Sequence, residues 1–246
     1  MIDTHAHLDA CADDADALVA RARATGVTRI VSVGTGPQSW RATLAVAEHN
    51  DGVHAALGLH PHEAADEGAL DELREALAHP RAVAVGETGL DYFRDYAPRD
   101  AQRRVFVAQL DLARELRKPV VVHTRAADAD TAYALRAFDG VVVLHCFSSL
   151  PLLEPALENG WYVSFAGNVT YKNAYDLRAA ARAVPSELLL VETDSPYLAP
   201  QPVRGKPNEP ANVVHTLAAL AAARGEDTAE LEARIDANAS AVFGLG

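Results

Sequence analysis

The sequence predicts an α/β protein that folds as a single-domain (β/α)8 barrel of the TIM type, and three observations support this class. Short apolar runs alternate with longer segments of helical periodicity along the chain. The chain has 246 residues, close to the roughly 250 that such a barrel needs. The first run leads into Asp3-Thr4-His5-Ala6-His7 and not into the glycine-rich turn of a dinucleotide-binding sheet.

Eight short runs are expected to be strands. Most are continuously apolar, as is usual for parallel strands that are covered on both faces. They lie at residues 1–4, 28–33, 53–57, 82–85, 119–122, 141–144, 161–164 and 188–191. Eight strands joined by mostly helical connections fit a closed barrel with its helices outside. Residues 1–246 show no repeat, low-complexity segment or linker, so one domain is expected.

The clearest expected helix covers residues 103–118, where apolar residues recur at helical spacing. Two further helices are expected at residues 211–224 and 228–238. Between the last strand and these helices, residues 197–210 are rich in proline and are expected to form an ordered surface loop.

Composition places the chain among globular proteins, since 49% of its residues are hydrophobic. Its apolar runs are too short to cross a bilayer, and it begins with strand-like sequence instead of a signal segment. A cytoplasmic location without a membrane partner is therefore expected. The two cysteines, Cys11 and Cys146, do not form a disulfide framework, and a buried thiol is expected at Cys146.

Polar residues follow five of the expected strands at the point where each ends. In a barrel these ends meet on one face, where catalytic groups collect. Imidazole and carboxylate are common ligands of divalent catalytic ions. The expected metal ligands are His5, His7, Glu87, His123, His145 and Asp194.

His5 and His7 alone would be weak evidence. Alternate residues of a strand share a face, so both imidazoles can reach one ion, but the pair is equally well explained as two polar residues at a strand end. The coincidence of histidines and carboxylates at five strand exits favours a metal centre. Glu87, from the middle of the set, can bridge two ions, which together can hold the attacking and leaving oxygens of a displacement.

His60 and His62 follow the third expected strand and face the same mouth. They can orient the substrate or support metal ligands, or Pro61 can fix them as loop structure, and the sequence leaves these readings open. If His60 acts in catalysis, we expect it to steady the scissile phosphate.

The net charge of −12, taken as a sum, argues against a nucleic-acid partner. Its distribution argues otherwise, because acidic residues crowd the helical segments while basic residues occur in the loops after strands, where bound dications add positive charge. These loop residues are Arg94, Arg99, Arg125, Lys172, Arg204 and Lys206. Arg125, two residues after a candidate ligand, is expected to stabilise the charge that develops during reaction.

Four aromatic residues also lie in the expected loops, namely Tyr92, Phe93, Phe147 and Tyr197. They can stack on the bases of a single strand, or they can pack the loops onto the barrel rim. Packing is the favoured interpretation for Phe93 and Phe147.

The motifs resemble those of the TatD-type metal-dependent deoxyribonucleases, which belong to the amidohydrolase-like barrels. Seven blocks occur in the expected order, and together they are far more specific than any one of them. They lie at residues 2–9, 58–61, 86–92, 122–125, 145–148, 192–198 and 208–212.

The resemblance implies that His5 and His7 bind one metal with Asp194, and that Glu87 bridges to a second metal. His123 and His145 would bind that second metal, and Asp194 would be the general base for the attacking water. Two positions depart from the family. Thr88 stands where a cysteine is frequent, and Ser149 stands where a glycine is frequent, so the loop after His145 is less well defined.

The function expected from these observations is divalent-metal-dependent hydrolysis of DNA phosphodiester bonds, as an exonuclease on single strands. Two ions of Mg²⁺, Mn²⁺ or Zn²⁺ and a monomeric protein are expected. One alternative is an acyl hydrolase that acts on an amide, ester or lactone, including aminoacyl-tRNA. A second alternative is a barrel without enzymatic activity that serves as an interaction module. The basic loop residues favour the phosphodiester, because an acyl substrate without phosphate does not need them.

Overall fold

The computed structural model describes residues 1–245, and residue 246, the last of the expected domain, lies outside them. Eight parallel strands form one sheet in the order β1 to β8, which confirms the predicted single-domain (β/α)8 barrel. The strands are β1 (Ile2–Ala6), β2 (Arg29–Gly34), β3 (Val53–Leu57), β4 (Ala82–Asp91), β5 (Val120–Arg125), β6 (Val142–Leu144), β7 (Tyr162–Phe165) and β8 (Leu189–Val191).

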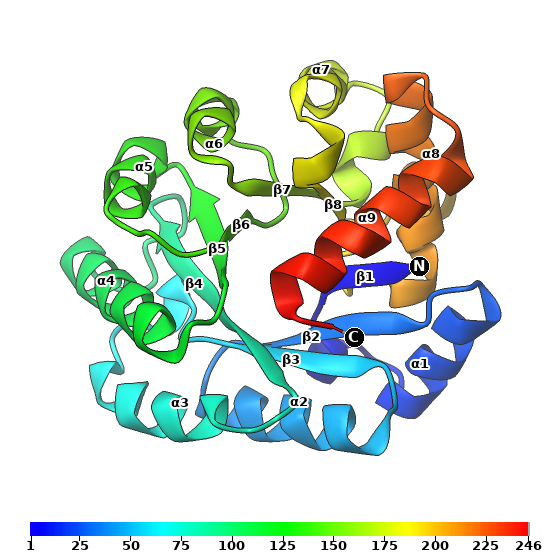
Figure 1. Ribbon diagram of the computed structural model, residues 1–246. Coiled ribbons are helices and arrows are strands. Elements are labelled where there is room, and N and C mark those ends of the chain that lie inside the picture. Colours follow the sequence, from blue (N-terminus) through cyan, green and yellow to red (C-terminus); the bar gives the residue numbers. More distant parts are fainter. Residues whose placement is uncertain (246) are drawn as a thin grey trace.

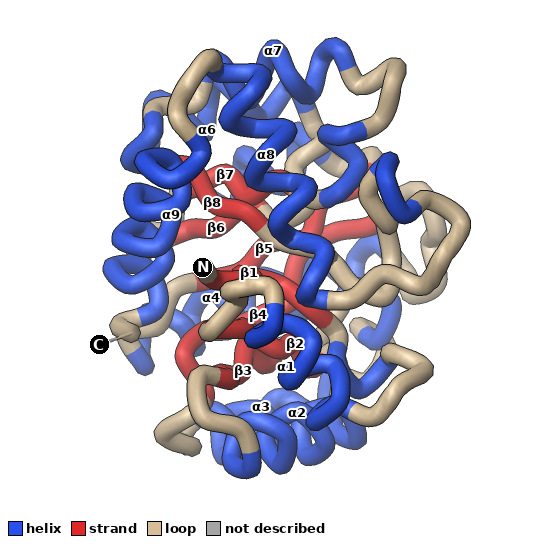
Figure 2. The backbone as a smooth tube through the Cα atoms, turned by 90° about the vertical axis from the view of Figure 1, so that its right-hand side faces the viewer, coloured by secondary structure: helices blue, strands red, loops and turns tan. Residues whose placement is uncertain are grey.

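The helices surround the strands, as Figures 1 and 2 show. They are α1 (Ala15–Ala24), α2 (Pro37–His49), α3 (Leu70–Leu77), α4 (Arg99–Leu116), α5 (Asp128–Arg136), α6 (Leu153–Asn159), α7 (Tyr175–Ala183), α8 (Val213–Arg224) and α9 (Thr228–Phe243). One core cluster fills the space between the strands and these helices, with Trp40 and Phe106 among its largest fully buried side chains.

The barrel closes through residues that follow the short strand β8. The backbone N of Asp194 donates to the carbonyl of His5 at 2.9 Å, and the N of His7 donates to the carbonyl of Ser195 at 2.7 Å. A parallel bridge between Ala6 and Ser195 continues this contact. The loop that follows β8 is therefore held directly beside the end of β1.

Helix α9 lies across the end of the barrel where the strands begin (Figure 1). Its residues Val242 and Phe243 pack with Ile2 and other inward-facing strand residues in a second core cluster. The amino group of Met1 lies 3.3 Å from the Asp236 carboxylate of the same helix. With this end covered, the opposite end is left for chemistry.

Most element boundaries agree with the sequence, and the differences have physical reasons. β4 and β5 extend to Asp91 and Arg125, beyond the apolar runs that predicted them, because their last residues are polar and serve the site. α4 begins four residues early, directly after Pro98. α9 continues to Phe243, since its last turns bury an apolar face against the barrel.

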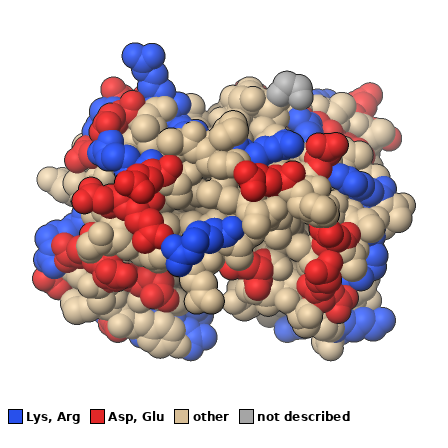
Figure 3. Space-filling model, turned by 90° about the horizontal axis from the view of Figure 1, so that it is seen from below, with Lys and Arg blue, Asp and Glu red and all other residues tan. Residues whose placement is uncertain are grey.

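Charge on the outer surface is mixed. On the face seen in Figure 3, which lies over α2 and α3, acidic and basic side chains are interspersed. Arg41 of α2 pairs with Glu72 of α3 at 2.5 Å, and Arg74 of α3 pairs with Glu115 of α4. In the part of the chain that the structure describes, every helix is too short or too polar to cross a membrane.

Candidate metal centre

A pocket of about 640 Å³ opens where the strands end, and it draws residues from the loops after most of them. The structure brings all of the expected metal ligands to this pocket, with His5 buried directly behind its lining. His60 and Arg125, the other two expected functional residues, also line it. Glu87, in the middle of β4, is the centre of the site, because it lies between two groups of histidines.

One carboxylate oxygen of Glu87 faces the first strand. Its Oε2 lies 3.4 Å from Nε2 of His5 and 3.5 Å from Nε2 of His7. These two imidazole nitrogens are 3.2 Å apart, and Oδ1 of Asp194 lies 3.5 Å from Nε2 of His7. His5, His7 and Asp194 therefore offer three donor atoms around one point.

The other oxygen of Glu87 faces the fifth and sixth strands. Its Oε1 lies 2.7 Å from Nδ1 of His123 and 2.9 Å from Nε2 of His145. Nε2 of His60 lies 3.3 Å from the same oxygen. The structure thus brings His60 into this half of the cluster, closer to the candidate ligands than its expected role as a phosphate contact requires.

The donor set fits divalent ions. Ligands that surround one ion at about 2.1 Å lie about 3.0–3.4 Å from one another, which is the spacing of many of these pairs. Three triads have their donor atoms within 4.8 Å of one another, namely His5, Glu87 and His145; His5, His7 and Asp194; and His60, Glu87 and His123. Glu87 belongs to two triads and presents one oxygen to each side, as a carboxylate between two ions does.

Electrostatics keep the central carboxylates ionised. Burial raises the pKa of Glu87, but the imidazoles of His145, His60 and His123 outweigh it and hold this pKa well below its usual value. Asp194 behaves alike, since burial raises its pKa and nearby histidines, His7 foremost, bring it below the usual range. Burial also lowers the pKa of His60 to about 4, so its imidazole is neutral and able to bind a cation near neutral pH.

Two carboxylates that were not predicted as site residues hold the histidines in place. Glu192 lies 3.2 Å from Nδ1 of His145. Oδ2 of Asp91 lies 2.8 Å from Nε2 of His62 and 3.5 Å from Nε2 of His123. Such contacts orient imidazole ligands at metal centres. Both carboxylates stand at strand exits within the motif blocks, and that position was the available signal.

Asp3, which was also not predicted as a site residue, links β1 to the loop that follows β8. Its carboxylate accepts hydrogen bonds from the backbone N of Thr193 at 2.9 Å and from Oγ1 of Thr193 at 2.6 Å. The N of His5 also donates to it, at 3.3 Å. Asp3 therefore fixes the relative position of His5 and the loop that carries Asp194.

The rim of the pocket only partly follows the sequence-based expectations. Arg94 and Arg125 line it, whereas Arg99 pairs with Asp95 at 2.8 Å at the start of α4. The remaining expected basic residues lie outside the lining, namely Lys172, Arg204 and Lys206. Of the six basic residues expected in the loops after strands, two arginines on one side therefore line the pocket.

The aromatic residues of the expected loops differ in how far they are exposed. Phe147 is 2% exposed, which confirms its predicted packing, but Phe93 is 61% exposed, so the packing predicted for it was wrong. Tyr197 is exposed and stands beside His7, with ring centroids 5.9 Å apart. Cys146 is only partly buried and lines the pocket, and burial raises the pKa of its thiol well above the usual value, which disfavours a thiolate nucleophile.

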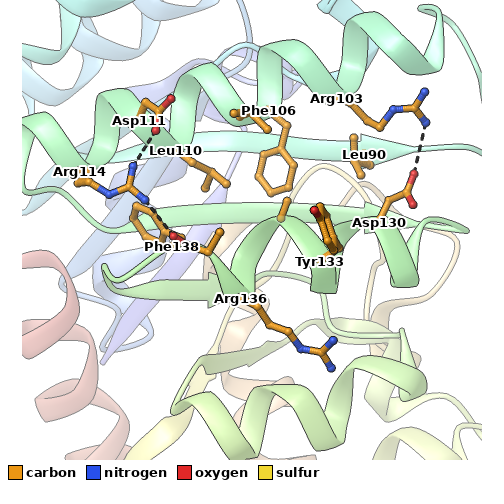
Figure 4. A pocket seen from close by; sticks show the side chains of 13 residues that line it. Leu90, Arg103, Phe106, Leu110, Asp111, Arg114, Asp130, Tyr133, Arg136 and Phe138 are labelled. Atoms are coloured by element: carbon orange, nitrogen blue, oxygen red, sulfur yellow. Dashed lines mark hydrogen bonds and ion pairs between the residues drawn. The ribbon is translucent and has the colours of Figure 1, made fainter.

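A larger hollow of about 860 Å³ lies outside the barrel between α4 and α5 (Figure 4). Its floor is apolar and includes Phe106 and Phe138. Four of its five charged residues pair with each other, Arg103 with Asp130 at 3.3 Å and Arg114 with Asp111 at 2.6 Å. It has none of the histidine–carboxylate triads found in residues 1–245, so the chemistry belongs to the smaller pocket at the strand ends.

A parallel barrel with a buried histidine–carboxylate cluster at its strand ends is the arrangement of a metal-dependent hydrolase. The model of the family described as "TatD related DNase" matches residues 2–244. The chain belongs to this family. The resemblance seen in the motif blocks is thereby confirmed.

Relatives with curated names span almost the whole chain. A Mycobacterium tuberculosis protein named "Uncharacterized metal-dependent hydrolase TatD" is 42% identical over 260 residues, which cover 100% of this chain and 98% of that protein. A Klebsiella pneumoniae protein named "3'-5' ssDNA/RNA exonuclease TatD" is 39% identical, covering 94% of this chain and 92% of that protein. Among solved structures, the TatD homologue YjjV from Escherichia coli superposes with a TM-score of 0.94 at 32% identity, covering 100% of this chain and 98% of that one.

Proposed function

We propose that this protein is a divalent-metal-dependent exonuclease that hydrolyses phosphodiester bonds at the end of single-stranded DNA. The observation that carries the proposal is Glu87, whose two oxygens face the two halves of a histidine–carboxylate cluster at the mouth of the barrel. The printed name of the Klebsiella pneumoniae relative, a single-strand exonuclease, supports this substrate class. We also propose that the protein acts as a monomer.

His5, His7 and Asp194 would hold one ion, and His123 and His145 would hold the other, with Glu87 between them. His60, at 3.3 Å from Glu87, is available to the second ion or to the scissile phosphate. Ions of Mg²⁺, Mn²⁺ or Zn²⁺ supply Lewis-acid polarisation of the phosphoryl group and lower the pKa of water.

Asp194 is the group proposed to take the proton from the attacking water. Its carboxylate is ionised because nearby imidazoles lower its pKa, and it lines the pocket beside His7. Its φ is +54°, in the left-handed region that non-glycine residues seldom adopt. Residues held in such conformations gather at functional sites, where the surrounding structure fixes them.

Arg125 is proposed to stabilise the negative charge that builds up on the phosphoryl oxygens. It ends β5, two residues beyond His123, and lines the pocket. A guanidinium presents several donors in a plane that matches phosphate oxygens, so it binds the transition state more strongly than a neutral group would.

Two rival functions remain. Acyl hydrolysis of an amide, ester or lactone can use the same metal arrangement, but it gives no role to Arg94 and Arg125 at the mouth. A barrel without enzymatic activity would have no use for two half-clusters that open into a pocket, since structural metal sites are closed shells. These observations favour the phosphodiester.

The test is cleavage of 5′-labelled single-stranded DNA and RNA by metal-stripped protein that is re-supplied with Mg²⁺, Mn²⁺ or Zn²⁺. A His5→Ala/His7→Ala variant should lose metal-restored cleavage. A His49→Ala variant, altered on the exposed side chain of a helix far from the pocket, should keep it. A product ladder that shortens from one end would support an exonuclease.

Two results would overturn the proposal. The first is metal-loaded protein that leaves both nucleic acids intact but hydrolyses an amide, ester or lactone, because the acyl hydrolase would then be the function. The second is cleavage that is equally strong in the His5→Ala/His7→Ala variant, because a contaminating nuclease would then explain it.

A further inference from the structure

The mouth of the pocket is divided by charge. Its exposed charged side chains are two carboxylates and two guanidinium groups. Asp9 and Glu63 follow β1 and β3, whereas Arg94 and Arg125 belong to the ends of β4 and β5. Because the strands lie in sequence order around the barrel, the acids occupy one sector of the rim and the arginines occupy the next.

An exposed aromatic ring stands beside the arginines. The guanidinium carbon of Arg125 lies 4.0 Å from the centre of the Phe93 ring, and that of Arg94 lies 5.8 Å from it. Strand register explains the contact, since Asp91 pairs with Arg125 and the backbone N of Tyr92 donates to the carbonyl of Arg125 at 2.9 Å. Phe93 is nonetheless 61% exposed, so the ring still offers apolar surface to a ligand.

Asp91 fixes this ring relative to the metal cluster. Its Oδ1 accepts hydrogen bonds from the backbone N of Phe93 at 3.0 Å and from that of Arg94 at 2.9 Å. Its Oδ2 faces His62 and His123 on the pocket side. One buried carboxylate therefore holds both the rim loop and a candidate metal ligand, which keeps the ring at a set distance from the reacting bond.

The two arginines are free to bind an anion. Many arginines of the helices pair with carboxylates, as Arg104 does with Glu67 at 2.6 Å and Arg114 with Asp111 at 2.6 Å. Within residues 1–245, Arg94 and Arg125 have no such partner. Unpaired guanidinium groups beside an exposed ring are the elements that hold the phosphate and base of a single-stranded nucleic acid.

The acidic sector has the opposite property. Oγ of Ser39 donates to the Asp9 carboxylate at 2.5 Å, and within residues 1–245 neither Asp9 nor Glu63 is paired with a basic side chain. Unpaired carboxylates repel a phosphate, but they accept hydrogen bonds from sugar hydroxyls. A strand end with a free sugar hydroxyl therefore fits this sector, and the 3′ end is the one indicated by the printed name of the Klebsiella pneumoniae relative.

We propose that the divided mouth binds a single strand in one direction. The nucleotide on the 5′ side of the scissile phosphate stacks on Phe93, with its phosphate at Arg94 and Arg125. The terminal nucleotide lies on the acidic side and presents its 3′-hydroxyl to Asp9 and Glu63. This inference rests on the proposed nuclease function and names the residues that would select the 3′ end of a strand.

The stacking half is tested with Phe93→Ala and a matched control, Tyr133→Ala, which removes an 81% exposed ring from α5. On an intact strand Phe93→Ala should lower kcat/KM about tenfold, the loss typical of one base–aromatic contact. On a strand with an abasic nucleotide 5′ of the scissile phosphate, Phe93→Ala and the wild type should react equally. Tyr133→Ala should match the wild type on both strands.

The acidic half is tested with Asp9→Asn/Glu63→Gln and 3′-phosphorylated strands. The wild type should cleave a 3′-phosphate strand at least about tenfold more slowly than a 3′-hydroxyl strand, because like charges repel. The double variant should bring this ratio close to one. The matched control, Glu158→Gln/Asp176→Asn, changes net charge equally at exposed sites on α6 and α7 and should keep the wild-type ratio.

The outcomes distinguish failure of the proposed nuclease activity from failure of the directional mouth. Metal-loaded wild type that cleaves no strand at all refutes the proposed function. Active wild type with no preference for the 3′-hydroxyl, or a Phe93→Ala defect of the same size on the abasic strand, overturns the directional mouth while leaving the nuclease intact.

Discussion

Oε1 of Glu192 lies 3.2 Å from Nδ1 of His145 and also accepts a hydrogen bond from the backbone N of Cys146 at 2.8 Å. The opposite nitrogen of the same imidazole, Nε2, lies 2.9 Å from Glu87. A ring held at Nδ1 has its Nε2 free for an ion, and the carboxylate increases its basicity. Glu192 is fully buried, so it acts on the cluster through His145.

Replacing Glu192 by Gln should weaken metal binding without unfolding the protein. The amide still accepts from Cys146, but it carries no charge to polarise His145, and loss of such a contact typically costs about 10–100-fold in metal affinity. Titration of metal-stripped protein with Zn²⁺ measures this. Glu187→Gln, a change in the short 3-10 helix that precedes β8 and outside the pocket lining, is the control, and equal affinities in both variants would contradict the role of Glu192.

Asp194→Asn tests the proposed general base. Loss of a positioned base typically lowers the rate about 10²–10⁴-fold, so kcat/KM on single-stranded DNA should fall at least about 100-fold. Metal content is measured on the same samples, because Asp194 also lies 3.5 Å from His7 and can contribute to ion binding. A variant that keeps its metal and its full activity would exclude Asp194 as the base.

The barrel and the positions of the candidate ligands could be predicted because both leave local marks in the sequence. An apolar run such as that of β5 identifies a buried strand, and the first polar residue after it, His123, identifies the mouth. The apolar runs did not mark where β4 and β5 end. Polar residues that point into the site interrupt the apolar pattern, so β4 was expected to end at Val85, although it reaches Asp91.

Contacts between distant segments left no such mark. Asp3 reads as one polar residue in a strand, yet its bonds to Thr193 join the two ends of the barrel. Phe93 reads as a rim residue that should be buried, yet its place beside Arg125 depends on how β4 and β5 pair. Such roles depend on register and side-chain direction, which a single sequence does not encode locally.

Asp3→Ala should destabilise the metal-free protein. The change leaves the buried N–H and hydroxyl of Thr193 without their acceptor, and each such loss costs about 1–3 kcal/mol. Urea denaturation should therefore show a loss of about 2 kcal/mol or more in the free energy of unfolding. Asp3→Asn, which keeps one acceptor oxygen, should lose less of the free energy of unfolding. An Asp3→Ala variant as stable as the wild type would refute the proposed link between β1 and the loop after β8.

Gly89 holds β4 close to β5, and Gly89→Ala tests how tightly. A Cβ there would lie 2.0 Å from the carbonyl oxygen of His123, and the residue has φ of +138°. We expect a loss of about 3 kcal/mol or more in urea denaturation, since the backbone of β5 would have to shift. Gly205→Ala separates strain from clash, because Gly205 has φ of +89° with open space around its Cβ position, and should cost only about 1–2 kcal/mol.

Metal binding should stabilise the fold through the same cluster. An ion that binds only the folded protein adds about 2.7 kcal/mol at a free concentration 100 times its Kd. For a chain of 246 residues this raises the Tm by several degrees, since each kcal/mol shifts it by about 2–4 °C. Thermal unfolding of metal-stripped wild type should show this rise on addition of Zn²⁺ or Mn²⁺, whereas His5→Ala/His7→Ala should show a smaller one and His49→Ala the full one. An equal rise in the double variant would mean that the ions bind elsewhere, because the imidazoles facing Glu87 and Asp194 would then be unnecessary.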